Sequence, residues 1–517
     1  MIVENKKDFI FHPFLLSLYP VVALLAHNMG EVYPVYALRP LVLSLLCGVL
    51  VYFLLRRFLP AHRAAMLFFW LGLLFFSYGH VYQLVEQASI GGLVIGQHRF
   101  LVVLWVGLLF GGGWLILTRT CDLETANRLL NLMSVVLFVV PLFQIVKFEV
   151  DRLNVQSKRK IEAAYHGEAD WALQPAQLNS ENHLPDVYYI ILDAYTRDDM
   201  LRKFYGLDIL PFIHRLSEMG FYVARCSQSN YAHTSLSIPS SLNMNYLQEV
   251  VPELMHNNMS WVHMGDYAKR SLVSQLFKQM GYRIVVFDTG NDLDRMEGAD
   301  ILVSRATSPW VVLLDFRQVS EFEILFLRTT ALRLLIELQP YLFPDLKVVR
   351  TPEQNHYQTI LYGLDELARL PSLNGPKFVY WHLIAPHPPF VFAEDGSYLL
   401  TGEADPGYTN EIKFLNVRIL ELMQTIIRES SSPPVIILQA DHGLDTENRM
   451  AIFNAYYLPD NRDEWLYPEI TPVNTFRVVF NVLFNAGYPL LDDVSYFSEH
   501  DTPYNFTEVR YPCEAGR

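Results

Sequence analysis

The chain has 517 residues with a formal net charge of −14, and 51% of its residues are apolar, giving a mean hydropathy of +0.17. Such a composition excludes a disordered or collagen-like protein and a purely soluble enzyme. The acidic balance argues against a nucleic-acid partner, because nucleic-acid binding depends on basic side chains that release counterions from phosphates.

The charge is unevenly distributed along the chain. Residues 1–150 carry ten basic and seven acidic side chains, whereas residues 151–517 carry 30 basic and 47 acidic ones. We therefore predict a transmembrane domain of about five helices at residues 1–150. A polar linker, helical in part, is expected at residues 151–184, followed by an outer domain at residues 185–517.

Four apolar runs in the first part are long enough to cross a bilayer, which takes about 20 residues. They lie near residues 36–55, 64–85, 100–117 and 129–148. A fifth, weaker run covers residues 10–26 and is either a first span or a signal peptide. We favour a span, because Asp8 interrupts its basic flank and the residues up to Ala26 make a poor cleavage site.

The loops between these runs differ in basic charge. Seven basic residues fall on one side of the predicted membrane and two on the other: Lys6, Lys7, Arg56, Arg57, Arg63, Arg119 and Arg128 against Arg39 and Arg99. The more basic side is cytoplasmic by the positive-inside rule. The outer domain is therefore expected outside the cytoplasm, whether the first run is kept or cleaved.

Only two of the four cysteines fall in the outer domain. Cys226 and Cys513 could pair in an oxidising compartment. Two unpaired thiols are equally compatible with the spacing, so the sequence leaves this question open.

Four short apolar runs in the outer domain are bounded by turn or polar residues. They cover residues 187–192, 282–287, 378–383 and 435–438, and segments with helical spacing, such as 259–279 and 410–428, lie between them. Buried strands that alternate with helices predict an α/β domain with a mainly parallel central sheet. Ligands of such sheets bind at the carboxyl ends of the strands.

Polar side chains follow all four runs. The first run ends at Asp193 and the second at Asp288, the third leads to His387, and the fourth is followed by Asp441 and His442. Any one of them alone would more often be a loop or capping residue. Together they suggest a divalent cation held by carboxylate oxygen and imidazole nitrogen.

A hydroxyl-rich segment, residues 229–243, lies between the first two runs. Its hydroxyl residues include Thr234, Ser235, Ser237, Ser240 and Ser241, with Pro239 among them. One interpretation is a helix N-terminus with its capping residues. The same N-terminus would present free N–H groups to an anion, which suits a hydroxyl nucleophile that attacks phosphorus next to a metal ion.

Four motifs occur in a fixed order: Leu-Asp-Ala-Tyr at 192–195, Asn-Tyr-x-x-Thr-x-Leu-Ser-x-x-Ser-Ser-Leu-Asn at 230–243, Pro-His-Pro-Pro-Phe at 386–390 and Asp-His-Gly at 441–443. In this order they resemble the sulfatase-like branch of the alkaline phosphatase superfamily, over residues 185–485. Several spans before such a domain are similar to the lipoteichoic acid synthases, phosphoglycerol transferases and phosphoethanolamine transferases. The resemblance implies an alkaline phosphatase/sulfatase-type fold outside a bacterial inner or plasma membrane.

The resemblance also implies roles for five residues. Asp193, Asp441 and His442 would bind one divalent metal ion, which could be Zn, Mn or Mg. Thr234 would be both the fourth ligand and the nucleophile, and His387 would contact the substrate phosphate or the leaving group. The register of the family favours Thr234 over the adjacent serine, which spacing alone does not.

The chain departs from the family pattern at two places. A sulfatase needs Cys or Ser followed by x-Pro-x-Arg, but Leu236 and Ile238 follow Thr234, so chemistry through formylglycine is disfavoured. Phosphoethanolamine transferases usually carry a further His about a dozen residues after Asp-His-Gly, where this chain has Phe-Asn-Ala at 453–455. This difference leans towards phosphoglycerol as the head group and leaves a second metal without evident ligands.

We therefore expect a membrane-bound transferase that moves a phospholipid head group, through a phosphothreonine at Thr234, to an exported glycan or lipid acceptor. Two alternatives stay open. One is a phosphoric or sulfuric ester hydrolase of the same fold, in which water replaces the acceptor. The other is a catalytically inactive membrane scaffold that binds lipid or protein partners.

Overall fold

The computed structural model describes residues 9–29, 34–86, 88–90, 93–94, 96–118, 122–165, 184–251, 264–289, 296–305, 319–342, 351–399, 404–459 and 462–513. The chain forms two compact units. The membrane unit comprises residues 1–156 and 306–352, and the outer unit comprises residues 157–305 and 353–517. Residues 306–352 thus belong to the membrane unit, although the predicted outer domain included them.

Five helices form the main part of the membrane unit: α1 (His12–His27), α2 (Leu38–Phe58), α3 (Ala61–Val85), α4 (His98–Thr118) and α5 (Leu123–Tyr165). A short turn, η1 (Pro34–Ala37), precedes α2, and a hairpin of β1 (Ser89–Ile90) and β2 (Leu93–Val94) joins α3 to α4. Four spans, Pro34–Phe58, Ala61–Val85, His98–Thr118 and Leu123–Val150, are long and apolar enough to cross a membrane. The predicted spans are confirmed, and the chain is an integral membrane protein. The fifth run forms α1, whose 16 residues rise only about 24 Å.

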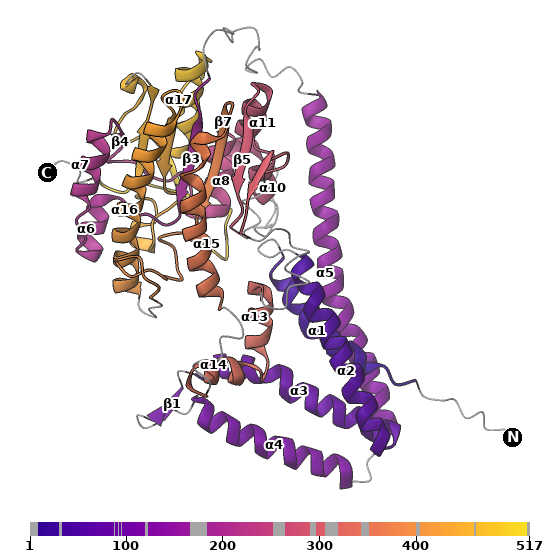
Figure 1. Cartoon of the computed structure of the whole chain (residues 1–517). Coiled ribbons are helices and arrows are strands. Elements are labelled where there is room, and N and C mark those ends of the chain that lie inside the picture. Colours follow the sequence, from indigo (N-terminus) through magenta and orange to yellow (C-terminus); the bar gives the residue numbers. More distant parts are fainter. Residues whose placement is uncertain are drawn as a thin grey trace. The chain divides into compact units, whose positions relative to one another are not determined.

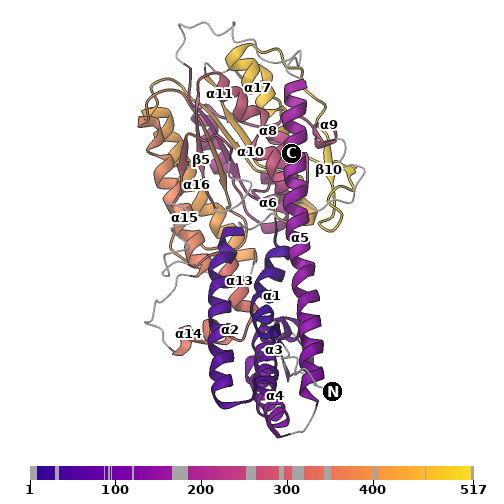
Figure 2. The ribbon, with the colours of Figure 1, turned by 90° about the vertical axis from the view of Figure 1, so that its right-hand side faces the viewer.

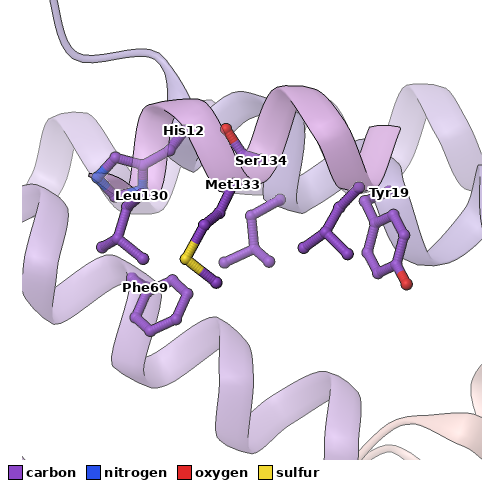
Figure 3. Close-up of a pocket in the computed structure, with 8 residues that line it drawn as sticks. His12, Tyr19, Phe69, Leu130, Met133 and Ser134 are labelled. Carbon is purple, nitrogen blue, oxygen red and sulfur yellow. The ribbon is translucent and has the colours of Figure 1, made fainter. Parts of the chain in front are cut away.

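A pocket with a mainly apolar lining lies between α1, α3 and α5, where Leu130 and Met133 point towards it (Figure 3). Its lining residues are His12, Leu16, Tyr19, Phe69, Leu130, Met133, Ser134 and Leu137. At one end, His12 Nε2 and Asn127 Oδ1 are 2.8 Å apart, and Asn127 donates to the carbonyl of His62 at 3.1 Å. These hydrogen bonds join α1, α3 and α5, so α1 is packed as a member of the bundle.

Residues 306–352 contain two further helices of the membrane unit, α13 (Glu321–Thr329) and α14 (Arg333–Leu342). They form ion pairs with Arg39 at the start of α2 and with His98 at the start of α4. Both of these helix ends are the ones that the loop charges predict to be external. The chain before and after this segment belongs to the outer unit. The contacts of α13 and α14 with external helix ends therefore agree with an outer unit outside the cytoplasm.

A disulfide joins Cys226 to Cys513, with 5.4 Å between the two Cα atoms. The sequence had left this pairing open. Disulfides persist mainly in oxidising compartments, so the bond also supports an external position for the outer unit.

A seven-stranded sheet in the order β4-β9-β8-β3-β7-β5-β6 forms the centre of the outer unit. Its strands are β3 (Val187–Leu192), β4 (Tyr222–Val223), β5 (Arg283–Phe287), β6 (Ile301–Val303), β7 (Lys377–Leu383), β8 (Val435–Gln439) and β9 (Asn454–Tyr457). The four predicted strands are β3, β5, β7 and β8, and all neighbouring pairs from β8 to β6 are parallel. Only β9, with its partner β4, adds antiparallel pairs. The predicted α/β fold with a mainly parallel sheet is confirmed.

Helices cover both faces of this sheet (Figures 1 and 2). One face carries α6 (Asp198–Tyr205), α7 (Leu210–Glu218), α15 (Pro352–Leu367) and α16 (Ala404–Glu429). The other carries α8 (Thr234–Leu242), α10 (Met264–Lys269), α11 (Leu272–Gln279) and α17 (Pro472–Phe484). The unit also contains α9 (Leu247–Val250) and the small sheet of β10 (Ser495–Phe497) and β11 (Thr507–Val509). The predicted helical segment 410–428 lies in α16, and segment 259–279 forms α10 and α11, with residues 259–263 outside the described part.

The central strand β3 is buried on both faces. Tyr188 and Ile190 belong to the core beneath α15 and α16, whereas Tyr189 and Ile191 belong to the core beneath α8 and α17. This arrangement explains why the strand reads as a continuous apolar run instead of alternating with polar residues.

A buried ion pair joins the starts of β3 and β7. Lys377 is only 1% exposed, and its Nζ lies 2.6 Å from Asp186 Oδ2. Its backbone N–H also donates to Asp186 Oδ1 at 3.2 Å. Burial raises the pKa of Asp186, although Lys377 opposes this shift. The pair therefore fixes the register of two central strands, but it depends on both partners being present.

We expect Lys377→Met to destabilise the outer unit, because it leaves Asp186 buried without a counter-charge, a loss of about 3–5 kcal/mol. The measurement is thermal unfolding of the purified chain in detergent. Lys413→Met is the control, since its partner Glu394 is 64% exposed and surface pairs contribute about 1 kcal/mol or less. Equal shifts of the unfolding temperature in the two variants would contradict this assignment.

Candidate active site

The proposed metal ligands gather at the carboxyl edge of the sheet. Asp193 follows β3 directly, and Asp441 and His442 follow β8, which pairs with β3 in parallel. All three side chains are buried, and one ligand atom from each lies within 4.8 Å of the others. The parallel pairing thus brings together residues that are far apart in the sequence.

Two carboxylate oxygens in this group, Asp193 Oδ1 and Asp441 Oδ2, are buried and have no hydrogen-bond partner among the described residues. By contrast, Asp441 Oδ1 accepts from the backbone N–H of His442 at 2.9 Å and of Ala194 at 3.2 Å. Burying a charged oxygen without a partner is costly. A divalent cation between the two oxygens would remove that cost, so these residues fit a metal ion.

The orientation of His442 also suits a ligand. Its Nδ1 donates to the carbonyl of Gly443 at 2.9 Å, which leaves Nε2 as the acceptor. This Nε2 lies 3.4 Å from Asp441 Oδ2 and 3.7 Å from Asp193 Oδ1. A metal held by the two carboxylates would therefore find an imidazole nitrogen facing it.

Burial and charge set the protonation of these groups. Burial opposes the ionisation of Asp193, but the imidazoles of His387, His382 and His442 outweigh it and lower its pKa below the usual range. Burial lowers the pKa of His442 to about 4. At neutral pH the site thus contains an ionised carboxylate and a neutral imidazole, the forms in which both bind metals.

Thr234 is the first residue of α8, as the hydroxyl-rich segment predicted for a helix N-terminus. The helix begins where the backbone N–H groups of Leu236 and Ser237 donate to the carbonyl of His233, at 2.9 and 2.8 Å. Thr234 Oγ1 lies 3.0 Å from His442 Nε2. The hydroxyl therefore meets the carboxylate cluster at the positive end of a helix, where an anion is stabilised.

His387 lies in the loop after β7, at the margin of this group. Its ring centroid is 6.4 Å from that of His442. Its Nδ1 donates to the carbonyl of Pro388 at 2.7 Å, so Nε2 is the nitrogen left for a substrate. The ring is half-buried, which suits contact with a phosphate or a leaving group.

Sequence reasoning missed His382, although the residue stands within a predicted strand. It is fully buried in β7 opposite Ile191, and its Nε2 lies 3.3 Å from Asp193 Oδ2. It therefore lies within ion-pair distance of the second oxygen of that carboxylate. The available signal was a single imidazole in an otherwise apolar run.

Sequence reasoning also missed Arg449. Its Nε donates to the carbonyl of Ala232 at 2.6 Å, and one terminal nitrogen donates to the carbonyls of Gly443 and Leu444 at 3.2 and 3.1 Å. The other terminal nitrogen lies 3.1 Å from His442 Nε2. Among the described residues, no carboxylate lies within 4 Å of this guanidinium. No sequence motif indicates Arg449, because its contacts are made with loops that only folding brings together.

Asp288, which the sequence placed at the end of a strand, and three other polar residues near strand or loop ends lie apart from the ligand group. Asp288 follows β5, two strands from β3, and accepts from Ser304. Asp395 accepts from the backbone N–H of Ser397 in a turn. Asn454 and Arg477 donate to protein groups, including the carbonyls of Ile470 and Met244 respectively. His233, adjacent to Thr234, lies 2.8 Å from the carbonyl of Ser498 through its Nε2.

No family model matches the chain, and comparison with curated proteins finds no match. Solved structures show similarity. The C-terminal periplasmic domain of EcEptC from Escherichia coli is 10% identical with a TM-score of 0.40, over 64% of this chain and 94% of that one, and it has also been solved in complex with Zn. Lipooligosaccharide phosphoethanolamine transferase A from Neisseria meningitidis is 11% identical with a TM-score of 0.38, over 91% and 95%. The lipoteichoic acid synthase LtaP from Listeria monocytogenes is 13% identical with a TM-score of 0.39, over 62% and 78%.

We expect Asp441→Asn to abolish metal binding, because it removes the negative charge of one of two unpartnered oxygens. The measurement is the metal content of the purified chain by elemental mass spectrometry, after separate exposure to Zn, Mn and Mg. Asp395→Asn is the control, since this exposed carboxylate lies in a surface turn. Wild-type metal content in the Asp441 variant would show that this group is not the metal site.

Proposed function

We propose that this protein transfers the phosphate-linked head group of a phospholipid to an exported glycan or lipid, through a phosphothreonine at Thr234. The observation that carries this proposal is the 3.0 Å contact of Thr234 Oγ1 with His442, within the buried carboxylate cluster at the start of α8. One divalent ion held by Asp193, Asp441, His442 and Thr234 would lower the pKa of the hydroxyl and neutralise phosphate oxygens.

In the first half-reaction, Thr234 Oγ1 forms a bond to phosphorus and gives up its proton to water. The bond between phosphorus and the glycerol oxygen of the lipid breaks, and diacylglycerol leaves. His387 gives that oxygen a proton, for which its position at the margin of the group is suited. In the second half-reaction, His387 removes a proton from the acceptor hydroxyl, which attacks phosphorus. The bond between phosphorus and Thr234 Oγ1 breaks, and this oxygen takes up a proton from water.

Arg449 supplies positive charge for the phosphate. Backbone carbonyls hold two of its nitrogens, and the third reaches the nitrogen of His442 that faces the cluster. If that imidazole nitrogen held a cation, it would no longer accept a hydrogen bond from Arg449. The guanidinium would then be free to donate to a non-bridging phosphate oxygen, a charge-assisted bond for which arginine is well suited.

The membrane unit fits a lipid donor, because it holds the chain in the layer where phospholipids reside. Phosphoglycerol is the head group that we favour, since Asn454 stands near the position where the phosphoethanolamine transferases usually carry a further His. Its side chain is fully buried and bonded to Ser227 and Tyr456 within the protein. Hydrolysis would use the same residues with water as the acceptor, and product analysis distinguishes the two reactions.

The direct test is mass spectrometry of the full chain after exposure to mixed phospholipid vesicles. We expect an added mass on the peptide that contains Thr234, and this mass identifies the head group. Thr234→Ala should remove the adduct and lower turnover by about 10³-fold or more. Ser235→Ala is the matched control, because it removes the adjacent hydroxyl. An unchanged rate in the Thr234 variant, or an adduct on Ser235, would overturn the proposal.

A second test concerns the guanidinium. We expect Arg449→Met to lower kcat by about 10²-fold, as the loss of one stabilising donor does in other transferase and hydrolase sites. Arg449→Lys should recover part of the rate, and the metal content should stay at the wild-type level in both variants. Parallel loss of metal and rate would instead show that Arg449 only supports the fold around His442.

A further inference from the structure

Helix α14 is amphipathic, but its charged face is turned towards the protein and its apolar face is exposed. A helix on a water-exposed surface shows the reverse arrangement. Its charged side chains, Arg333 and Glu337, are one turn apart and face the rest of the membrane unit, with side-chain exposures of 16% and 34%. Leu335 and Leu338 lie on the other face and are 63% and 39% exposed. Helices packed in water bury their apolar face instead. The exposed leucines therefore indicate an apolar surrounding.

The charged face of α14 is held by the external ends of α3 and α4. Arg333 pairs with Glu86 at 3.4 Å and stacks over the ring of Tyr82 at 4.3 Å. Glu337 Oε2 lies 2.5 Å from His98 Nε2. Figure 1 shows α14 beside the end of α3 and the start of α4, which the β1–β2 hairpin joins. Charges that point inward and pair with one another are typical of segments within a membrane.

The turn between α13 and α14 lies beside α3, below the end of that helix. The backbone N–H of Ala331 donates to the carbonyl of Phe75 at 2.8 Å. Phe75 precedes the last residue of α3, Val85, by ten positions, which is about 15 Å along the helix axis. The turn comes so close because Gly79 has no side chain, since a Cβ there would lie 2.0 Å from the carbonyl oxygen of Arg328.

Helix α13 is fastened to the bundle by a buried ion pair. Arg39 donates two hydrogen bonds to the carboxylate of Glu323, and both side chains are at most 10% exposed. Glu323 also caps its own helix through the backbone N–H of Ser320. Breaking such a pair leaves an uncompensated buried charge, so α13 is fixed to α2.

We propose that residues 319–342 form a re-entrant element of the outer leaflet, in which Leu335 and Leu338 contact the acyl chains of phospholipids. Acyl chains are the occupant that fits, because the two spans that hold α14 also expose apolar residues at their external ends, Leu84 of α3 and Phe100 of α4. The chain enters and leaves this element from the outer unit. The outer unit is thus attached to the membrane by this element as well as by α5, whatever reaction it catalyses.

The test places a nitroxide label at the two leucines and measures its surroundings by electron paramagnetic resonance. Cys47→Ala and Cys121→Ala remove the two cysteines outside the disulfide, and Leu335→Cys or Leu338→Cys then takes the label in the full chain in phospholipid vesicles, with the disulfide left oxidised. The measured quantity is the ratio of the label's collision rate with oxygen to its collision rate with a water-soluble nickel chelate. We expect this ratio to be several-fold higher at the two leucines than at a water-exposed site. This ratio does not depend on catalytic activity.

Two controls bracket the result. Leu104→Cys on α4 provides the lipid-exposed reference, and Val417→Cys on α16 of the outer unit provides the water-exposed reference, since these side chains are 55% and 56% exposed. A ratio at Leu335 and Leu338 equal to that at Val417 would overturn the proposal. A partner protein over this face would overturn it as well, because the label would then be shielded from both collision reagents.

A further variant tests the depth of the turn. Gly79→Leu fills the space that the turn occupies, so we expect the label at Leu335 to become more accessible to the nickel chelate. The label at Leu104 should keep its lipid-exposed ratio, which shows that the bundle is intact. An unchanged collision ratio at Leu335 in this variant would show that the turn between α13 and α14 does not lie beside α3 at Gly79.

Discussion

The parallel pairing of β3 with β8 is the constraint on which the candidate site depends. It brings the ends of both strands to one edge of the sheet and so places Asp193 next to Asp441. Two buried carboxylates repel each other, and their unpartnered oxygens destabilise the fold unless a cation lies between them. The cores on both faces of the sheet offset this cost. The position of α8, and with it the hydroxyl of Thr234, rests on the same sheet.

Much of the outer unit could be predicted, because its information is local in the sequence. Apolar runs gave the four central strands, and the residues directly after them included Asp193, Asp441 and His442. His382 and Arg449 could not be found in this way. The first is a lone imidazole inside a strand, and the second reaches the site only because folding brings residues 232, 443 and 449 together. Motifs identify candidate ligands, whereas tertiary contacts identify the groups that surround them.

The assignment of residues 319–342 to the membrane unit was out of reach for a different reason. Helices of nine and ten residues are too short to register as spans, and their composition is mixed. What reveals their environment is the direction of their side chains and the space beside Gly79, a residue far away in the sequence. Net charge was equally uninformative about the substrate. A chain of charge −14 can still bind an anion through Arg449 and the start of α8.

The disulfide between Cys226 and Cys513 has a consequence for the order of assembly. The two cysteines are 287 positions apart, and Thr234, His387, Asp441 and His442 all lie between them. Cys513 therefore leaves the ribosome after every one of these residues, and its thiol is oxidised only after export. The covalent ring that encloses Thr234, Asp441 and His442 therefore closes late, outside the cytoplasm. A copy whose outer unit stayed in the cytoplasm would keep its spans but would lack this disulfide.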